Sequence, residues 1–121
     1  MQHSCDTVPY KGDLPENHEI VNTIEWNELN QQYGPFTYLI VDSEGSLYYV
    51  LKDNPDFLDN IKVIIIENDF HSHEHLNYVN NAFKNANFVC SYKKGIDDFL
   101  GEQHNDLYCI WIKQAQPFWV Y

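Results

Sequence analysis

Two short runs of consecutive apolar residues constrain the fold of this chain most. Residues 38–41 are Tyr-Leu-Ile-Val and residues 63–66 are Val-Ile-Ile-Ile, with no polar residue in either run. An uninterrupted run of this length, rich in β-branched residues, is typical of a strand buried on both faces, as in a parallel sheet between helices. An acid follows each run, Asp42 and Glu67. The sequence therefore predicts an α/β fold with a buried pair of parallel strands.

The segments around the two runs have the spacing of further helices and strands. Trp26, Leu29 and Tyr33 are spaced as on one helix face, and Gly34-Pro35 then ends that helix. We expect helices at 26–33, 47–51 and 72–86, and further strands at 20–24, 88–92 and 108–112. Residues 1–19 are polar and predict an N-terminal arm, 20–114 predict the α/β domain, and 115–121 predict an aromatic tail with Phe118, Trp119 and Tyr121.

From residue 38 onward the expected order is β-α-β-α-β-β. The first two strands form the parallel pair, the last two are antiparallel closing strands, and helices cover both faces. In such sheets, ligands bind beyond the carboxyl ends of the parallel strands. Asp42 and Glu44 follow the first strand, and Glu67 and Asp69 end and follow the second. We therefore expect any site of this chain at that edge.

The charge balance and the cysteines exclude several classes of protein. Eighteen acids face seven basic residues, all of them Lys, for a net charge of −11. This charge argues against nucleic acid and anionic membrane surfaces as partners. No apolar run approaches the ~20 residues of a membrane span, and the first residues do not have the pattern of a signal peptide. Three cysteines without C-x-x-C spacing argue against a disulfide framework. The sequence predicts a cytoplasmic protein.

Several stretches match, in order, the pattern of a known family. They are Ile24-Glu25-Trp26-Asn27-Glu28-Leu29, Tyr33-Gly34-Pro35-Phe36, Leu39-Ile40-Val41-Asp42-Ser43-Glu44-Gly45, Val50-Leu51-Lys52 and Ile64-Ile65-Ile66-Glu67. This series resembles the second half of FkbM-type methyltransferases, whose pattern is T-x-[DE]-x-L, F-x-x-L-K-I-D-x-E-G, V-L-K and I-I-I-E. Leu107 to Lys113 is similar to the closing strand of that family. The resemblance covers residues 18–113.

The resemblance implies a class I, S-adenosylmethionine-dependent methyltransferase fold. This chain then supplies the fourth strand, the fifth strand and the final antiparallel pair, which is half of a Rossmann-like methyltransferase sheet. The first strand, the glycine-rich loop and the acid for the cofactor ribose should precede residue 18, where Gly12 stands alone. We therefore expect no cofactor in the isolated chain, and S-adenosylmethionine only where an N-terminal methyltransferase half completes the domain.

The carboxylates have a catalytic and a structural interpretation. In the family, the loop with Asp42 and Glu44 lines the cleft beside the methyl donor, so that a carboxylate can orient or deprotonate a hydroxyl. Alternatively, Ser43 and Glu44 cap the following helix. Glu67 ends an apolar strand, where burial raises the pKa of a carboxyl group, or it accepts hydrogen bonds from the next loop.

The densest group of ligand-type side chains lies between residues 69 and 75. Asp69, His71 and His73 are the candidate ligands of a divalent metal. Metal-dependent sugar methyltransferases of the macrocin type resemble this layout, with carboxylates after the fourth and fifth strands. The alternative interpretation is a polar loop followed by the first turn of a helix.

These features lead to three hypotheses about function. The first is the acceptor-side half of an O-methyltransferase that acts on a sugar or polyketide hydroxyl. The second is a non-catalytic, self-assembling scaffold protein, and the third is a metal-binding hydrolase. Because the neighbour of strand 38–41 in the family fold is missing here, we also expect a homodimer formed through a sheet edge.

Overall fold

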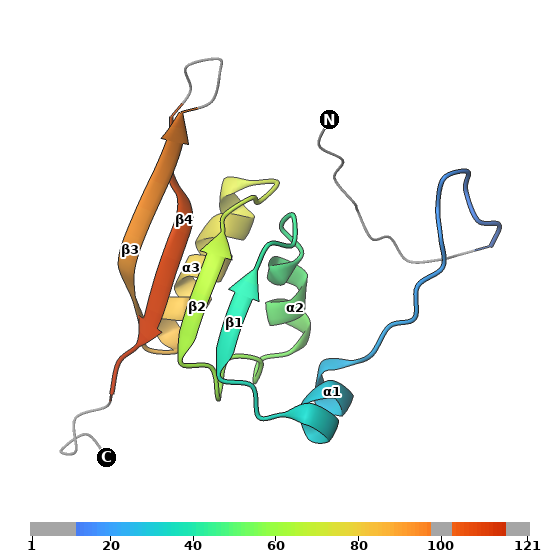
Figure 1. The fold of residues 1–121 in the computed structure, drawn as a ribbon, viewed down its shortest axis with the longest axis horizontal. Coiled ribbons are helices and arrows are strands. Elements are labelled where there is room, and N and C mark those ends of the chain that lie inside the picture. Colours follow the sequence, from blue (N-terminus) through green and yellow to red (C-terminus); the bar gives the residue numbers. More distant parts are fainter. Residues whose placement is uncertain (1–11, 98–102, 116–121) are drawn as a thin grey trace.

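The computed structural model describes residues 12–97 and 103–115. The described residues form three helices and four strands, which alternate as far as β3 and end with β4 directly after it (Figure 1). They are α1 (Trp26–Tyr33), β1 (Tyr38–Val41), α2 (Leu47–Asp53), β2 (Val63–Glu67), α3 (His73–Asn85), β3 (Phe88–Asp97) and β4 (Gln103–Lys113). From β1 onward this is the expected order, β-α-β-α-β-β. The prediction of a mixed α/β fold is confirmed.

The four strands form one mixed sheet in the order β1-β2-β4-β3. β1 and β2 are parallel, with Val41 opposite Ile66. β4 is antiparallel to β2 and to β3, and it lies between them (Figure 1). The parallel pair with antiparallel closing strands is therefore present. The closing strands are longer than expected, and β3 has irregular register between Cys90 and Tyr92 and between Lys94 and Ile96.

The hydrophobic core lies between the sheet and the two helices α2 and α3. Alternate strand residues face it, because successive side chains of a strand point to opposite faces. The buried set is Val41, Leu47, Leu51, Leu58, Ile61, Ile64, Ile66, Val79, Phe83, Phe88, Cys109 and Trp111. Both crossover helices contribute to this single layer, so they cover the same face of the sheet (Figure 1).

The expectation of helices on both faces is therefore wrong for the described residues. In the described part of the chain, the sheet face opposite the core carries exposed apolar side chains. Tyr38 is 71% exposed, Ile40 is 76% exposed and Ile65 is 45% exposed. We call this surface the open face. Helix α1 does not cover it, because Trp26 packs beside the sheet against Phe57, with ring centroids 4.5 Å apart. An uninterrupted apolar run indicates that a strand is hydrophobic, but the run alone does not show which of its faces is covered.

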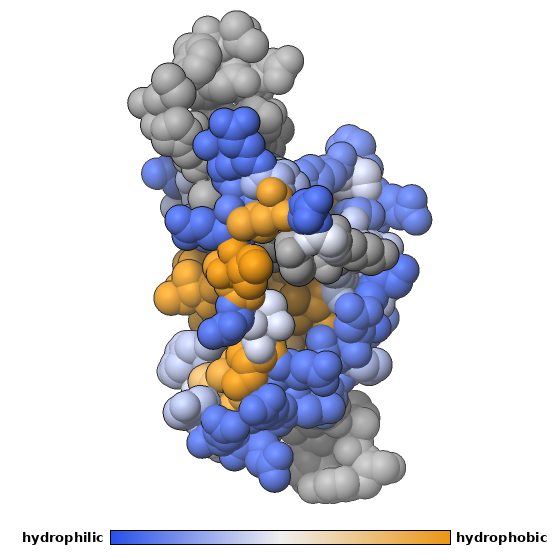
Figure 2. Space-filling model, turned by 90° about the vertical axis from the view of Figure 1, so that its right-hand side faces the viewer, coloured by the Kyte–Doolittle hydropathy of each residue, from blue (hydrophilic) through white to orange (hydrophobic). Residues whose placement is uncertain are grey.

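The segment before α1 differs from the prediction. The described residues 12–25 contain neither helix nor strand, so the strand expected at 20–24 is not formed there. Ile20 and Val21 are 64% and 63% exposed. Figure 2 views the molecule from the side of β1 and this segment, and apolar surface runs along its middle between hydrophilic margins. Most of the arm and the residues Phe118, Trp119 and Tyr121 of the tail lie outside the described residues.

Candidate functional site

The loops after β1 and β2 come together at the carboxyl end of the parallel pair. Because Val41 lies opposite Ile66, the next residues of the two strands, Asp42 and Glu67, are neighbours on the open-face side. The loops also touch, since a Cβ atom added at Gly45 would lie 3.0 Å from the carbonyl oxygen of Asp69. The four acids predicted at this edge therefore lie together. We call Asp42, Glu44, Glu67 and Asp69 the carboxyl cluster.

The backbone turns sharply between β1 and α2. Glu44 has φ of 52° and Gly45 has φ of 87°, both in the left-handed region. For a residue with a side chain this conformation is costly, and it occurs often at functional sites. A glycine is needed at position 45 for two reasons: it adopts this backbone angle without strain, and it leaves room for the carbonyl oxygen of Asp69.

The structural interpretation, in which Ser43 and Glu44 cap the following helix, is not observed. Helix α2 begins at Leu47, its N-cap is Ser46, and no described side chain makes a hydrogen bond at this cap. The backbone N–H of Ser46 donates to the carbonyl oxygen of Ser43 at 3.1 Å, which closes a turn before the helix. The carboxyl group of Glu44 instead shares a hydrogen bond with that of Asp69.

The pKa is raised for two carboxyl groups of the cluster. The hydrogen bond to Asp69, and next the charge of Asp69, raise the pKa of Glu44 above its usual 4.5. Burial, and next a hydrogen bond to Asp42, raise the pKa of Glu67 above the same value. A neighbouring carboxylate repels the negative charge of the ionised form and so favours the protonated form. A carboxylate whose pKa is raised is a stronger base than an ordinary carboxylate, which is the property that general base catalysis requires.

The candidate metal ligands do not converge. Asp69 is hydrogen-bonded to Glu44, and His73 is an exposed residue that begins α3. The ring of His71 lies over Gly45, with its Cδ2 atom 3.4 Å from the position of an added Cβ. In the described ranges, no three His, Cys, Asp or Glu side chains are placed to hold a metal ion.

His75, the last histidine of this segment, lies in the first turn of α3 and packs against α2. Its backbone N–H donates to the Oγ atom of Ser72 at 3.1 Å, as expected for a helix cap. Its ring stacks on Tyr48, with centroids 3.7 Å apart and an interplanar angle of 6°. The edge of Tyr49 completes the contact at 5.6 Å. The histidine-rich segment is therefore divided between a loop, an exposed helix start and an aromatic stack.

Sequence reasoning missed Asn68, which lies between two residues of the cluster. Its backbone N–H donates to the carbonyl oxygen of Leu107 at 2.6 Å. Its side-chain amide donates to the Sγ atom of Cys109 at 3.2 Å. Asn68 thereby attaches the end of β2 to β4, and it holds the backbone between Glu67 and Asp69 in place. An amide directly after an apolar strand was the signal available in the sequence.

Comparison with protein families, curated proteins and solved structures finds no match for this chain. In the described part of the chain, no helix combines the length and apolar character needed to cross a membrane.

Proposed function

We propose that this chain is the acceptor-side half of an O-methyltransferase-like domain, with the carboxyl cluster as its proton-accepting group. Its substrate class would be a sugar or polyketide hydroxyl, and an N-terminal methyltransferase half would supply the rest of the sheet. The resemblance to FkbM-type methyltransferases is the source of the reaction class. The observed strand order supports the proposal, because the resemblance implies a parallel pair followed by antiparallel closing strands.

The observation that carries the proposal is the state of Glu67. It lies at the carboxyl end of the parallel pair, where ligands collect in open α/β sheets. Burial and the hydrogen bond to Asp42 raise its pKa, which makes it a stronger base than an ordinary carboxylate. An acceptor hydroxyl bound at this edge could therefore transfer its proton to Glu67 or its partner Asp42.

The described residues do not fit S-adenosylmethionine by themselves. Ahead of β1, residues 12–25 form neither helix nor strand, and Gly12 has nothing within 4 Å of an added Cβ atom. A glycine that cradles a cofactor would approach other backbone closely. The methyl donor therefore belongs to the proposed N-terminal half, and this chain contributes the acceptor side.

Reconstitution tests the proposal. The chain is mixed with the N-terminal, glycine-rich half of an FkbM-type methyltransferase, and S-adenosylmethionine binding is measured by calorimetry. We expect the mixture to bind the cofactor with a micromolar Kd and the isolated chain not to bind it. Glu67→Gln should keep that binding and lower methyl transfer to a sugar hydroxyl. Micromolar binding by the isolated chain, or unchanged transfer by Glu67→Gln, contradicts the proposal.

A second candidate function, self-assembly as a homodimer, is favoured by the outer edge of β1. Among the described strands, none pairs with that edge, and its residues Tyr38 and Ile40 are highly exposed. An apolar strand edge promotes association with another chain unless it is covered. Light scattering should then report twice the chain mass of 14.3 kDa. The dimer should tighten with salt, because salt screens the repulsion between two chains of charge −11.

The two candidates make opposite predictions for one experiment. Both use the outer edge of β1, so an added N-terminal methyltransferase half should dissociate a dimer if the first proposal holds. A dimer that persists in excess N-terminal half, without cofactor binding, favours the scaffold function. A monomer at high protein concentration and moderate salt contradicts self-assembly.

A further inference from the structure

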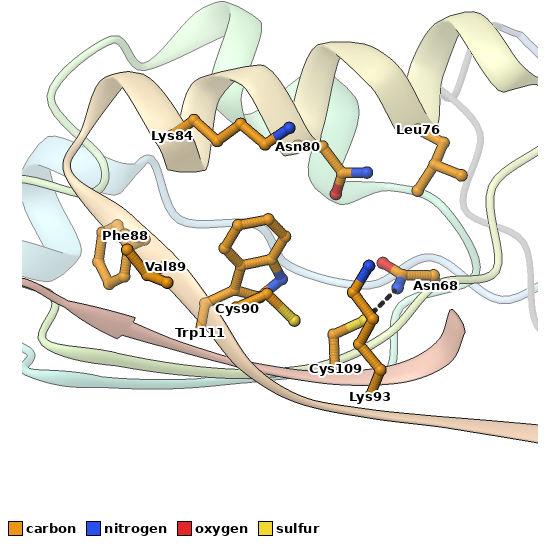
Figure 3. Close-up of a pocket in the computed structure, with 10 residues that line it drawn as sticks. All are labelled: Asn68, Leu76, Asn80, Lys84, Phe88, Val89, Cys90, Lys93, Cys109 and Trp111. Carbon is orange, nitrogen blue, oxygen red and sulfur yellow. Dashed lines mark hydrogen bonds between the residues drawn. The ribbon is translucent and has the colours of Figure 1, made fainter. Parts of the chain in front are cut away.

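A pocket of about 280 Å³ lies on the covered face of the sheet, between α3 and the strands β3 and β4 (Figure 3). From α3 it is lined by Leu76, Asn80 and Lys84. The strands contribute Lys93 and Trp111, among others. This volume is at the small end of the range for ligand sites, so it suits a compact molecule rather than a nucleotide-sized one.

Trp111 and Asn80 each bring a buried polar atom to this pocket that has no hydrogen-bond partner among the described residues. Trp111 is only 5% exposed, and its unpartnered atom is the indole Nε1. The unpartnered atom of Asn80 is the amide Oδ1. The great majority of buried polar groups in folded proteins are hydrogen-bonded, so an unpartnered pair in one pocket needs an explanation. The indole N–H of Trp111 can donate a hydrogen bond, and the amide oxygen of Asn80 can accept one. A bound molecule with one acceptor and one donor would satisfy both groups.

The pocket is also cationic in a strongly acidic chain. Lys84 and Asn80 extend from α3 above the indole of Trp111, and Lys93 extends from β3 toward Asn68 (Figure 3). These are two of the seven lysines in a chain of charge −11. None of the described residues that line the pocket is acidic. The described lining residues therefore carry positive and no negative side-chain charge, which favours an anion.

We infer that this pocket binds a small hydroxycarboxylate. The carboxylate lies near Lys84 and Lys93 and accepts the N–H of Trp111, while the hydroxyl group donates to Oδ1 of Asn80. Leu76 and Phe88 provide apolar walls for the carbon skeleton. An aliphatic amino group in place of the hydroxyl is disfavoured, because its positive charge would be repelled by the two lysines. This inference is independent of the proposed methyltransferase role, since it uses no residue of the carboxyl cluster.

Titration with 4-hydroxybenzoate, followed by nuclear magnetic resonance, tests the inference. We expect a saturable shift of the Trp111 indole N–H signal, with a Kd in the millimolar range that is normal for ~10 non-hydrogen atoms. Two analogues separate the contributions. The neutral 4-hydroxybenzamide and the hydroxyl-free benzoate should each bind at least about threefold more weakly, because each lacks one of the required groups. Equal binding of all three compounds, or no saturation by 4-hydroxybenzoate, overturns the inference.

Matched variants locate the binding site. Lys84→Gln should weaken 4-hydroxybenzoate at least about threefold, through loss of a charged partner. Lys62→Gln is the control, because it removes the same charge from an exposed lysine that does not line the pocket. Trp111→Phe should also weaken binding, measured from the backbone amide of Val89. If Trp111→Phe does not fold, the two lysine variants still decide, and equal affinities for them overturn the inference.

Discussion

The two faces of the sheet have similar residues and different surroundings. Ile64 and Ile66 are 0% exposed beneath α2 and α3, whereas Ile65 between them is 45% exposed on the open face. Three consecutive isoleucines thus have two different environments, which are set by the alternation of side chains along a strand. The covered face contains the core and the proposed hydroxycarboxylate pocket. The open face has the carboxyl cluster at one end, and it borders the edge of β1 with which no described strand pairs.

The difference teaches that folding stability and contacts with other protein chains are divided between the faces. Burial of apolar area is the main favourable contribution to folding, so the covered face should determine the free energy of unfolding. Exposed apolar area contributes little to folding but favours contact with other molecules. Each of the following changes tests one side of that division.

Ile66→Ala should give the largest effect. It removes a fully buried side chain from the covered face, and such truncations lower the free energy of unfolding by about 3 kcal/mol. Urea unfolding followed by circular dichroism measures the loss. Ile65→Ala is the matched control, with an expected loss of about 1 kcal/mol or less. Equal losses in the two variants would show that the open face is as well packed as the covered one.

Gly45→Ala should have the next largest effect, because it acts on the contact between the two loops of the cluster. The new Cβ atom combines an unfavourable φ of 87° with a 3.0 Å approach to the carbonyl oxygen of Asp69. We expect a loss of about 2 kcal/mol in unfolding free energy. Gly12→Ala is the control, since Gly12 also has positive φ, 78°, but has nothing within 4 Å. If both variants lose the same free energy, the loop contact contributes nothing.

The pH dependence of stability should change by a smaller amount in Glu67→Gln. The pKa of Glu67 is higher in the folded state than its usual 4.5, so the folded state holds the proton more tightly. The resulting stabilisation is complete below about pH 4.5 and is lost as the pH rises through the folded-state pKa. Glu67→Gln removes this loss, and its melting temperature should therefore exceed that of the parent at pH 7 but not at pH 4.

A charge-matched variant separates this effect from the general repulsion in an acidic chain. Glu19→Gln removes a negative charge from an exposed residue outside the cluster. It should raise the melting temperature at pH 7 less than Glu67→Gln does. A lower melting temperature of Glu67→Gln at pH 7 would contradict the assignment of Glu67 as a destabilised carboxylate.

Much of the fold could be predicted from local sequence signals. The two apolar runs became β1 and β2, Ser72 caps α3, and the four acids after the parallel strands lie together, because short-range patterns and strand direction determine these features. The sequence could not show which face of the sheet the helices cover. In residues 38–41 and 63–66, the side chains that point to one face and those that point to the other are all apolar. The left-handed backbone of Glu44 was also unexpected for a residue with a side chain.

The details of the sites depended on contacts between distant segments. From the sequence, Glu44 was a plausible helix-capping residue. In the structure its carboxyl group instead has a hydrogen bond with that of Asp69, which belongs to a different loop. The pocket beside Trp111 forms where α3 packs over β3 and β4. Trp111 lies there because β4 is inserted between β2 and β3 in the sheet. Such features arise from tertiary packing, which a single sequence does not encode in any local pattern.

Ile40→Thr should have the smallest effect on stability and tests the function of the open face. Ile40 is 76% exposed on the edge strand, and Thr keeps the β-branched shape that suits a strand. We expect the free energy of unfolding to change by no more than about 0.5 kcal/mol at low protein concentration. If a second copy covers this edge, the same change should weaken the dimer about tenfold, measured by analytical ultracentrifugation at moderate salt, because it removes apolar area from the contact. Asn22→Ser, in the exposed segment before α1, is the control and should leave the dimer unchanged. An unaltered dimer in Ile40→Thr would place the contact elsewhere and would leave the open face without a demonstrated role.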